Sequence, residues 1–363
     1  MPHAHPLDGV DLRARVQRVL DQHLTQQRAV LAELGPPMGP LVDSVADLLL
    51  GGKRLRAAFL YWGWRALGGE DDESVIRAAS AMEIFQAAAL LHDDVMDNSD
   101  LRRGRPTAHR AFASQHHEYG WSGDPERFGH AAAILAGDLC LNWTDEIFST
   151  SGLPREALEL ARAEFDRMRT QLMGGQFLDI LEGAHGWADL GYEQRLERSR
   201  TVIRYKSAQY SVSQPLLIGA YAARADEDTI KALASYGLAL GEAFQLRDDV
   251  LGVFGDPDET GKPAGDDLRE GKHTALIAHA LELADADGAE LISASLGDPD
   301  LDDQTVAMCR EVLTRSGALE RTEAMIEAGA TEALAALETL TTLTDEGRAA
   351  LVELVAICTQ RQT

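Results

Sequence analysis

The chain has 363 residues, of which 45% are hydrophobic, and it carries a formal net charge of −25 from 34 basic and 59 acidic side chains. Its length is ample for a large buried core, and its acidity argues against nucleic acid or an anionic membrane surface as a partner. Helix-forming residues fill the long stretches between loops, while alternating β-branched runs are scarce, so we predict an all-α protein.

A single domain is expected over residues 1–363, because no linker, low-complexity tract or internal repeat divides the chain. The motifs described below define a core over about residues 40–295, which C-terminal helices follow over 296–363. No run reaches the roughly 18 uncharged apolar residues of a transmembrane segment, and the start lacks the regions of a signal peptide. Three widely spaced cysteines fit reduced thiols, so we expect a cytoplasmic protein with neither disulfides nor a zinc site.

A basic run flanked by glycines opens the series of motifs, with the sequence Gly-Gly-Lys-Arg-Leu-Arg at residues 51–56. Glycines let the backbone approach a ligand closely, and Lys53 and Arg56 supply charge. The chain has only five lysines beside 29 arginines, so lysine is not its ordinary surface cation. Lysine is a compact, strongly hydrated point charge. Four of the five stand in motif-like surroundings, namely Lys53, Lys206, Lys262 and Lys272.

The first of two aspartate clusters ends a nearly uncharged run that starts at Ser80, and it reads Leu-His-Asp-Asp-Val-Met-Asp at residues 91–97. Side chains four residues apart lie one above the other on a helix, so Asp93 and Asp97 would share a face. The apolar run predicts a buried helix, in which unpaired charge is costly. We therefore interpret the cluster as a ligand site, against the alternative of a solvated helix face.

A loop with adjacent arginines follows the first cluster and reads Asp-Leu-Arg-Arg-Gly-Arg-Pro-Thr at residues 100–107. Arg102 and Arg103 can clamp a diphosphate through bidentate hydrogen bonds. The alternative is that these arginines pair with the neighbouring Asp97 and Asp100.

The second aspartate cluster lies about 155 residues after the first and reads Phe-Gln-Leu-Arg-Asp-Asp-Val-Leu-Gly at residues 244–252. Two facing clusters would form a cage of oxygen ligands, which suits Mg²⁺ when the ion also bridges substrate phosphates. The cations of the motifs then divide into two groups. One diphosphate would be bound, together with metal ions, by Lys206, Lys262 and Lys272. A second diphosphate would be bound, without metal, by Lys53, Arg56 and Arg103.

Taken in order, these motifs closely resemble those of the trans-isoprenyl diphosphate synthases, the polyprenyl synthetase family, and in particular the bacterial geranylgeranyl diphosphate synthases. The match extends from about Gly51 to Thr274 and includes Ala-Gly-Asp at 136–138, Gly-Gly-Gln at 174–176 and Lys206-Ser207. The resemblance implies the all-α isoprenoid synthase fold, a single large helical bundle around a deep central cavity. It also implies a homodimer and a requirement for Mg²⁺, with about three ions in each active site and Mn²⁺ as an alternative.

The activity that the resemblance implies is head-to-tail prenyl transfer, in which isopentenyl diphosphate extends an allylic diphosphate and pyrophosphate is released. The allylic starter would be dimethylallyl, geranyl or farnesyl diphosphate. Metal ions would be held by Asp93, Asp97 and Asp248, with support from Asp94 and Asp249. The departing diphosphate would be neutralised by Lys206 and Lys262. Isopentenyl diphosphate would be bound by Lys53, Arg56, Gln86 and Arg103. The remaining substrate-binding candidates are Arg102, Ser207, Gln245 and Lys272.

Two positions depart from the pattern of many family members. Gly252 stands where they have an aspartate, so the outer carboxylate of the second cluster is missing and we expect weaker metal affinity there. Gln86 stands where they have a histidine, and both side chains can donate a hydrogen bond to phosphate.

Product length is predicted from the helix that carries Asp93. One helical turn rises about 5.4 Å, close to the length of one extended isoprene unit. Ala88 and Ala89, one turn before Asp93, are too small to block a growing chain. Phe85, one turn deeper, would be the floor with Met82 below it, unless Phe85 simply packs in the core. We therefore predict geranylgeranyl diphosphate as the product, with a longer chain or farnesyl diphosphate as alternatives.

Two further interpretations remain open. A class I terpene cyclase would share the fold and the first cluster but would need no site for a second diphosphate, so the two basic motifs count against it. A non-catalytic subunit that regulates an active synthase would explain the loss of a carboxylate at Gly252. Against this second interpretation, the inner aspartates and the motif cations are all present.

Overall fold

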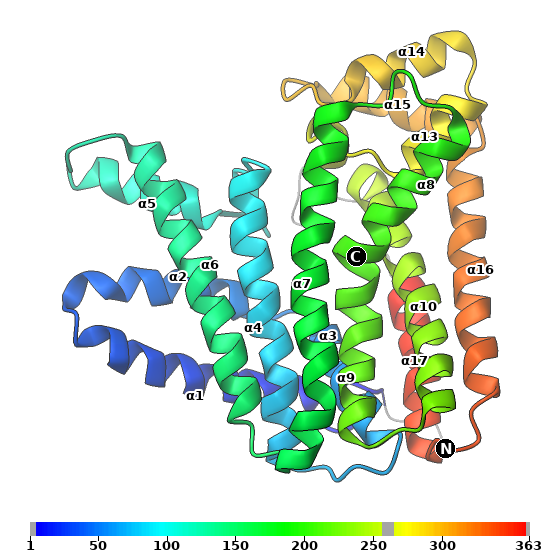
Figure 1. Cartoon of the computed structure of the whole chain (residues 1–363). Coiled ribbons are helices and arrows are strands. Elements are labelled where there is room, and N and C mark those ends of the chain that lie inside the picture. Colours follow the sequence, from blue (N-terminus) through cyan, green and yellow to red (C-terminus); the bar gives the residue numbers. More distant parts are fainter. Residues whose placement is uncertain (1–4, 256–264, 361–363) are drawn as a thin grey trace.

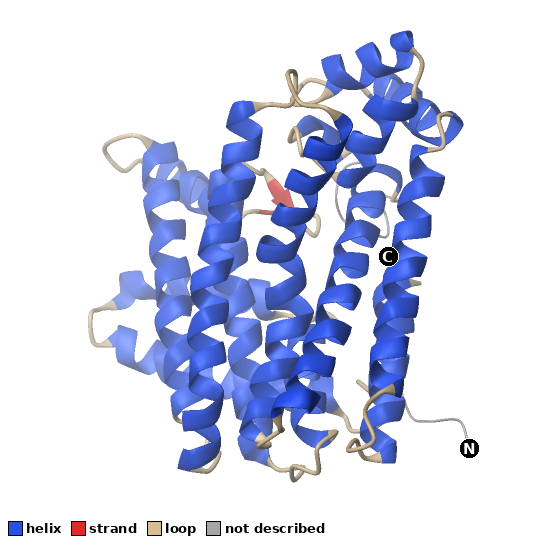
Figure 2. Cartoon of the chain, turned by 45° about the vertical axis from the view of Figure 1, so that its right-hand side comes forward, coloured by secondary structure: helices blue, strands red, loops and turns tan. Residues whose placement is uncertain are grey.

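The computed structural model describes residues 5–255 and 265–360, and nearly all of their regular structure is helical (Figure 2). The prediction of an all-α protein is confirmed. Within the described residues, the exceptions are two short antiparallel strands, β1 (Leu101–Arg102) and β2 (Arg105–Pro106), which form a hairpin in the arginine-containing loop.

The helices follow one another along the whole described chain. The first half forms α1 (Leu12–Ala32), η1 (Pro36–Met38), α2 (Gly39–Leu49), α3 (Leu55–Arg65), α4 (Glu73–Met96), α5 (Ala108–Glu118), α6 (Pro125–Ser149) and α7 (Arg155–His185). The second half forms α8 (Tyr192–Val202), η2 (Ile203–Ser213), α9 (Gln214–Ala222), α10 (Glu227–Phe254), α12 (Asp266–Arg269), α13 (Ala275–Leu283), α14 (Ala286–Ser295), α15 (Asp303–Arg315), α16 (Ala318–Glu338) and α17 (Asp345–Thr359).

The two helices that carry the aspartate clusters, α4 and α10, are long and are capped by aspartates at their N-termini. Asp72 accepts hydrogen bonds from the backbone N–H groups of Ser74 and Val75 at 2.8 and 3.2 Å, which satisfies donors that the first turn of α4 leaves open. Asp226 does the same for the N–H group of Thr229 in α10, at 2.8 Å. Both clusters lie within the last two turns of their helices, where the backbone carbonyl groups favour a nearby cation.

Among the described helices, α4 alone is long and apolar enough to cross a membrane, but 72% of its most apolar window is buried inside the protein. It packs against α1, α3 and α6. A helix that is apolar nearly all round and enclosed by other helices is a core helix.

Figure 1 shows the long helices α4, α7, α10 and α16 running in roughly the same direction, with α13, α14 and α15 gathered at one end of the bundle. η2 packs against α7 and α10, and α10 also packs against α16 and α17. The main core includes Leu351 and Leu354 of α17. The C-terminal helices therefore share a core with the helices that carry the motifs, while a smaller apolar cluster lies under α13, α14 and α15.

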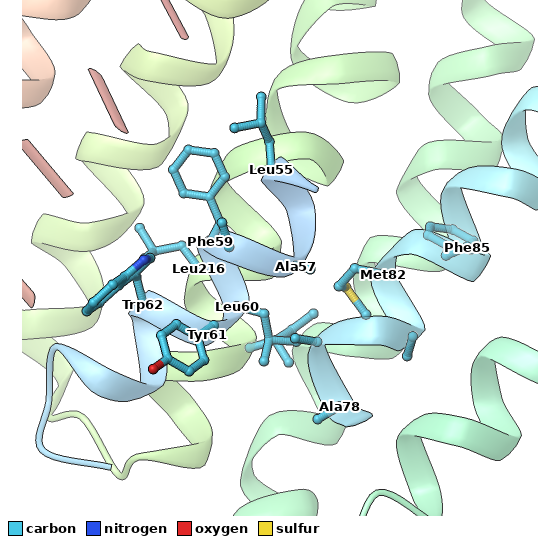
Figure 3. Packing of buried hydrophobic residues seen from close by; sticks show 14 of the residues in the cluster. Leu55, Ala57, Phe59, Leu60, Tyr61, Trp62, Ala78, Met82, Phe85 and Leu216 are labelled. Atoms are coloured by element: carbon cyan, nitrogen blue, oxygen red, sulfur yellow. The ribbon is translucent and has the colours of Figure 1, made fainter. Parts of the chain in front are cut away.

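The core between α3 and α4 is built from side chains that are almost completely buried (Figure 3). Phe59, Leu60, Met82 and Phe85 are each at most 2% exposed, and burying each contributes roughly 2 kcal/mol relative to exposure. Phe85 also contacts the ring of Tyr210 in η2 edge to face, with 6.1 Å between ring centroids. This packing holds α4 in place between α3 and η2.

A π-helix, η2, interrupts the path from α8 to α9. Such segments are rare and occur mostly at functional sites. Pro215 is the second residue after η2. A proline lacks the N–H group of a regular helical bond and collides with the carbonyl group four residues earlier, so the wider π-helical turn relieves a local conflict. Five residues of η2 line the cavity described below, namely Ile203, Lys206, Ser207, Tyr210 and Ser211.

Candidate active site

A cavity of about 710 Å³ opens among α4, α7, η2 and α10, together with the loop before α3 and the short helix α12. Its volume is typical of small-molecule sites. One part of its lining combines carboxylates with Lys206 and Lys272, and another contains the glycine-flanked basic run. The two kinds of motif that lie far apart in the sequence therefore share one cavity.

Asp93 of the first cluster contacts residues of both α7 and η2. Its Oδ1 accepts a hydrogen bond from Gln176 Nε2 at 2.7 Å and lies 3.4 Å from Lys206 Nζ, which also contacts Asp179 at 2.5 Å. Burial would raise the pKa of Asp93, but the neighbouring cations, Lys206 above all, outweigh burial and hold the pKa below its usual value. Asp93 is therefore charged at neutral pH.

Gly175 lets α7 come close enough to η2 for these contacts. A Cβ atom at this position would lie 2.4 Å from the carbonyl carbon of Tyr205 and 2.5 Å from the backbone nitrogen of Lys206, closer than packed atoms approach. The next residue, Gln176, reaches Asp93. The Gly-Gly-Gln motif thus joins two helices and orients one carboxylate, and a side chain at Gly175 would push Lys206 away from Asp93.

Asp97 and Asp249 are each repelled by a neighbouring carboxylate. Burial and the nearby Asp93 raise the pKa of Asp97 to about 7, and burial and the nearby Asp267 raise the pKa of Asp249 to about 8. A divalent cation would remove this repulsion, so the donor set fits Mg²⁺. Within the described residues, the side chains alone do not gather three ligands around one point, as expected for ions that take part of their coordination from substrate phosphates.

Asp94 and Arg102 form a buried pair rather than facing a ligand separately. Asp94 is 1% exposed, and its Oδ1 accepts hydrogen bonds from Arg102 Nε at 2.8 Å and Nη2 at 2.5 Å. The alternative pairing with Asp97 or Asp100 is wrong, because Arg102 pairs with Asp94 while Asp100 accepts from Arg110 at 2.7 Å. The structure favours a supporting role for Asp94 and Arg102, in which they hold the hairpin loop against α4, over direct metal or substrate binding.

The second cluster receives a carboxylate that its own sequence lacks. Asp248 and Asp249 line the cavity from α10, and Gln245 donates a hydrogen bond to Asp249 at 2.8 Å. A Cβ atom at Gly252 would lie 2.0 Å from Oδ2 of Asp267 and 2.4 Å from its Cγ. Asp267 of α12 thus fills the space of a side chain at position 252. A carboxylate of α12 therefore lies where the second cluster lacks one of its own, and the weaker metal affinity expected from Gly252 stays a prediction.

Gly252→Asp is therefore expected to weaken Mg²⁺ binding rather than to strengthen it, because the new side chain displaces Asp267. Changes in the shell around metal ligands typically cost ~10- to 100-fold in affinity, and we expect a loss near the lower end. Calorimetric titration of Mg²⁺ in the presence of inorganic pyrophosphate measures the change. The double variant Gly252→Asp/Asp267→Gly moves the carboxylate from α12 to α10 and should recover most of the affinity, whereas tighter binding by Gly252→Asp alone would contradict this account.

Lys272 lies beside the second cluster, with its Nζ 2.5 Å from Glu270 and 3.3 Å from Asp267. Burial would lower the pKa of Lys272, but Asp267 and Glu270 together raise it well above its usual value, so the side chain stays charged. Ser207 also lines the cavity, as predicted. Lys262, the remaining predicted lysine, lies outside the described residues.

The glycine-flanked run and the hairpin loop meet at the second group of cations. Arg103 Nη1 donates a hydrogen bond to the backbone carbonyl group of Leu50 at 3.4 Å. Arg56 Nη2 donates to Ser211 Oγ at 2.7 Å, and its guanidinium lies over the ring of Tyr210, 4.3 Å from the centroid. The residues predicted to bind the second diphosphate all line the cavity, namely Lys53, Arg56, Gln86 and Arg103.

Of the four residues predicted to control product length, the structure places one at the cavity. Ala89 lines it, whereas Ala88, Phe85 and Met82 are at most 1% exposed and belong to the surrounding core. Tyr210, which packs against Phe85, presents an aromatic ring to the cavity. The assignment of Phe85 as a direct floor is thus corrected, since its ring supports Tyr210 from behind.

Asp179, Asp267 and Tyr210 are among the residues at the site that were not predicted from the sequence. Asp179 follows Gln176 by three residues, so helical spacing within the Gly-Gly-Gln motif was a usable signal. Asp267 precedes Lys272 by five residues but gives no sign of its relation to Gly252. Tyr210 gives no local signal, because its direction depends on the π-helical turn.

Comparisons with known proteins agree with this geometry. The sequence pattern of the family described as polyprenyl synthetase matches residues 40–313. The geranylgeranyl diphosphate synthase of Saccharolobus solfataricus is 33% identical over 272 residues, 73% of each chain. The geranylfarnesyl diphosphate synthase of Aeropyrum pernix is 32% identical over 277 residues, which cover 75% of this chain and 79% of that one. A geranylgeranyl pyrophosphate synthase from Corynebacterium glutamicum, crystallised with isoprenyl diphosphate and magnesium, superimposes with a TM-score of 0.91 at 41% identity, over 96% of this chain and 98% of that one.

Proposed function

Because the chain belongs to the polyprenyl synthetase family and is a prenyltransferase, we propose that it makes geranylgeranyl diphosphate from isopentenyl diphosphate and an allylic diphosphate with Mg²⁺ as cofactor. The observation that carries the proposal is the presence of two anion-binding groups in one cavity, of which only one includes the carboxylates that suit metal ions. A terpene cyclase, which binds one diphosphate, has no use for the second group. The relatives named for geranylgeranyl products support this length, and the geranylfarnesyl relative makes a longer chain the alternative.

The first group of charges would assist cleavage of the allylic C–O bond. Heterolysis of the allylic C–O bond leaves a carbocation and a diphosphate, so the leaving group must be neutralised where its charge develops. Mg²⁺ held by Asp93, Asp97 and Asp248 would supply most of that neutralisation. Lys206, which Asp179 holds beside Asp93, would place a further positive charge at the departing oxygens.

The second group of charges would assist formation of the new C–C bond. Lys53, Arg56 and Arg103 would hold the diphosphate of isopentenyl diphosphate so that its double bond faces the carbocation. The π electron pair forms the new C–C bond, and the proton lost from the adjacent carbon passes to the released pyrophosphate. Apolar lining residues such as Leu172 and Phe244 would exclude water, which would otherwise capture the carbocation.

Product analysis tests this proposal directly. The purified chain is incubated with Mg²⁺, isopentenyl diphosphate and each allylic starter, and the dephosphorylated products are separated by chromatography. The expected end product is geranylgeraniol. Farnesol as the end product would refute the proposed chain length, and the absence of any product with every starter would refute the proposed synthase activity.

Lys53→Ala and Arg56→Ala should chiefly raise the KM for isopentenyl diphosphate and leave the KM for the allylic substrate nearly unchanged. The reason is that both cations lie in the group that has no metal-binding carboxylate. Loss of one charge-assisted hydrogen bond costs about 1.5–3 kcal/mol, or roughly 10- to 100-fold in affinity. Lys231→Ala is the matched control, since Lys231 is 65% exposed and pairs only with neighbours on α10. An equal rise in both KM values would refute the division into two diphosphate sites.

A homodimer and a cytoplasmic location complete the proposal. Exposed apolar side chains occur on α6 and on α7, including Ile134, Leu135, Met173, Phe177 and Ile180. Apolar residues in this number on exposed helices support an interface between two copies of the chain, which sedimentation velocity of the purified protein would reveal. The three cysteines are free and buried, which supports a reducing compartment.

A further inference from the structure

A buried ion pair lies directly behind the second group of cations. Arg54, at the start of α3, and Glu83 of α4 approach to 3.2 Å between Nη1 and Oε2, with side-chain exposures of 5% and 3%. Burying two charges costs several kcal/mol of hydration, which the pair repays only when the remaining donors and acceptors are also bonded. The stability of this pair therefore depends on the other hydrogen bonds of Arg54 and Glu83.

Those other hydrogen bonds all reach the backbone and side chains around the glycine-flanked run. Arg54 Nη2 donates to Gln17 Oε1 at 2.5 Å and also to the backbone carbonyl group of Leu49. Glu83 Oε1 accepts from the backbone N–H group of Ala57 at 3.1 Å. One carboxylate of α4 thus binds the residue that follows Lys53 and the residue that follows Arg56.

Glu83 replaces the capping side chain that α3 lacks. Arg54 is the N-cap residue of α3 and forms no side-chain cap. The N–H group of Ala57 belongs to the first turn, whose donors have no partner within the helix, and a carboxylate is favoured there by the helix dipole. α4 thereby fixes the position at which α3 begins.

The backbone at this point adopts a conformation that needs external support. Arg54 has φ of 56° and ψ of 36°, in the left-handed region, which is unfavourable for a residue other than glycine. Gly51 and Gly52 before it also have positive φ, at 68° and 90°. Strained residues persist where the surroundings over-determine them, and the contacts of Arg54 supply that constraint.

The same carboxylate lies among cations that repel one another. Burial lowers the pKa of Arg103, and Arg102 and Arg54 lower it further, while Glu83 acts in the opposite direction. Four cations surround this part of the cavity, namely Lys53, Arg54, Arg56 and Arg103. Glu83 lines the cavity from α4 as their anionic neighbour.

We propose that Glu83 and Arg54 are positioning residues for isopentenyl diphosphate: their buried pair holds the segment 51–56 in the shape that presents Lys53 and Arg56 to the diphosphate. The inference rests on the proposed function. Positioning and electrostatics predict opposite effects of Glu83 on diphosphate binding. Removal of the negative charge of Glu83 increases the positive potential of the subsite and by itself would tighten diphosphate binding. Loss of positioning would instead weaken diphosphate binding, and we expect this weakening to exceed the electrostatic gain.

The test is Glu83→Gln, a change that keeps the size of the side chain and removes its charge. We expect the KM for isopentenyl diphosphate to rise at least ~10-fold, since small misplacements of binding groups have large effects, while the KM for the allylic substrate changes less than about twofold. Glu242→Gln is the matched control, because Glu242 likewise pairs with arginine side chains, those of Arg200 and Arg204, but lines no part of the cavity. An unchanged or lower KM for isopentenyl diphosphate, or an equal rise in both KM values, would overturn the inference.

A second variant separates positioning from stability. Glu83→Gln leaves Arg54 buried without its anion, which can lower the thermal midpoint. The double variant Glu83→Gln/Arg54→Met leaves no buried charge, so its thermal midpoint should return toward that of the wild type, while its KM for isopentenyl diphosphate stays high. Recovery of both quantities together would show a purely structural role. Prenyl transfer by the wild-type chain is measured in the same series, and its absence would refute the proposed function itself.

Discussion

Asp93→Asn should lower turnover about a thousandfold while the protein remains folded. Asp93 is the carboxylate that Gln176 and Lys206 hold at 2.7 and 3.4 Å, and its pKa lies below the usual value, so it is an anion before any metal ion arrives. Asparagine has nearly the same size and keeps an oxygen for Gln176 but carries no charge. Removal of one group that stabilises developing charge commonly costs ~3–4 kcal/mol in the transition state, and here the cost falls on ionisation of the allylic substrate.

The measurement is the rate of product formation at saturating substrates over a series of Mg²⁺ concentrations, with circular dichroism to verify the fold. Asp248→Asn should behave in the same way, because Asp248 lines the cavity from the opposing helix α10. Asp43→Asn serves as the control, since Asp43 is 61% exposed and pairs with Arg28 on the surface. Near-normal turnover of Asp93→Asn at low Mg²⁺ would mean that the first cluster does not bind the catalytic ions.

Ala89→Phe should change the end product from geranylgeranyl to farnesyl diphosphate. Ala89 lines the cavity one helical turn before Asp93, and one turn of about 5.4 Å corresponds to roughly one isoprene unit. A phenyl ring there would remove roughly one isoprene unit of space along α4, which is the difference in length between the two products. The assay is chromatography of the dephosphorylated products, and farnesol should replace geranylgeraniol almost completely.

The neighbouring Ala88 supplies the control for this product change. Ala88 is fully buried and lines no part of the cavity, so Ala88→Phe should overpack the core and lower the free energy of unfolding by about 1–3 kcal/mol without shortening the product. If Ala88→Phe shortened the product and Ala89→Phe did not, the growing chain would have to follow the other side of α4.

The sequence was sufficient for the parts of the site that depend on helical periodicity and on charge. An apolar run ending in aspartates predicts a buried helix that delivers carboxylates, and Asp93 and Asp248 indeed line one cavity. The rarity of lysine pointed to Lys53, Lys206 and Lys272, which line it too. These inferences need only the spacing of residues along one element.

The remainder of the site depends on contacts between elements, which spacing does not reveal. The relation between Gly252 and Asp267 arises because α12 folds back onto α10. Which way Phe85 points depends on how α4 packs against η2, and it points into the core toward Tyr210. Arg102 could reach several aspartates, and the hairpin loop decides in favour of Asp94.

Glu83 shows where a signal in the sequence was overlooked. It stands in the middle of the run from Ser80 to Leu91, whose apolar character was used to predict a buried helix. A lone carboxylate on such a helix must have a partner, because an unpaired buried charge is costly. That partner is Arg54, which stands in the sequence between the two cations assigned to substrate, Lys53 and Arg56.

The π-helical segment η2 also limits which mutations can change the cavity wall in evolution. A π-helical hydrogen bond spans five residues, whereas an α-helical one spans four. A regular helix that accepts one inserted residue without unfolding would contain such a segment. Deletion of one residue from η2 would return the segment to α-helical spacing and leave the later helix in phase, but it would rotate side chains inside η2 by about 100° around the helix axis and so exchange residues of the wall for residues of the core. Substitutions can therefore change the side chains at positions 210 and 211 one at a time. Only an insertion or a deletion can change the angular position around the helix axis that places Tyr210 and Ser211 beside Lys206.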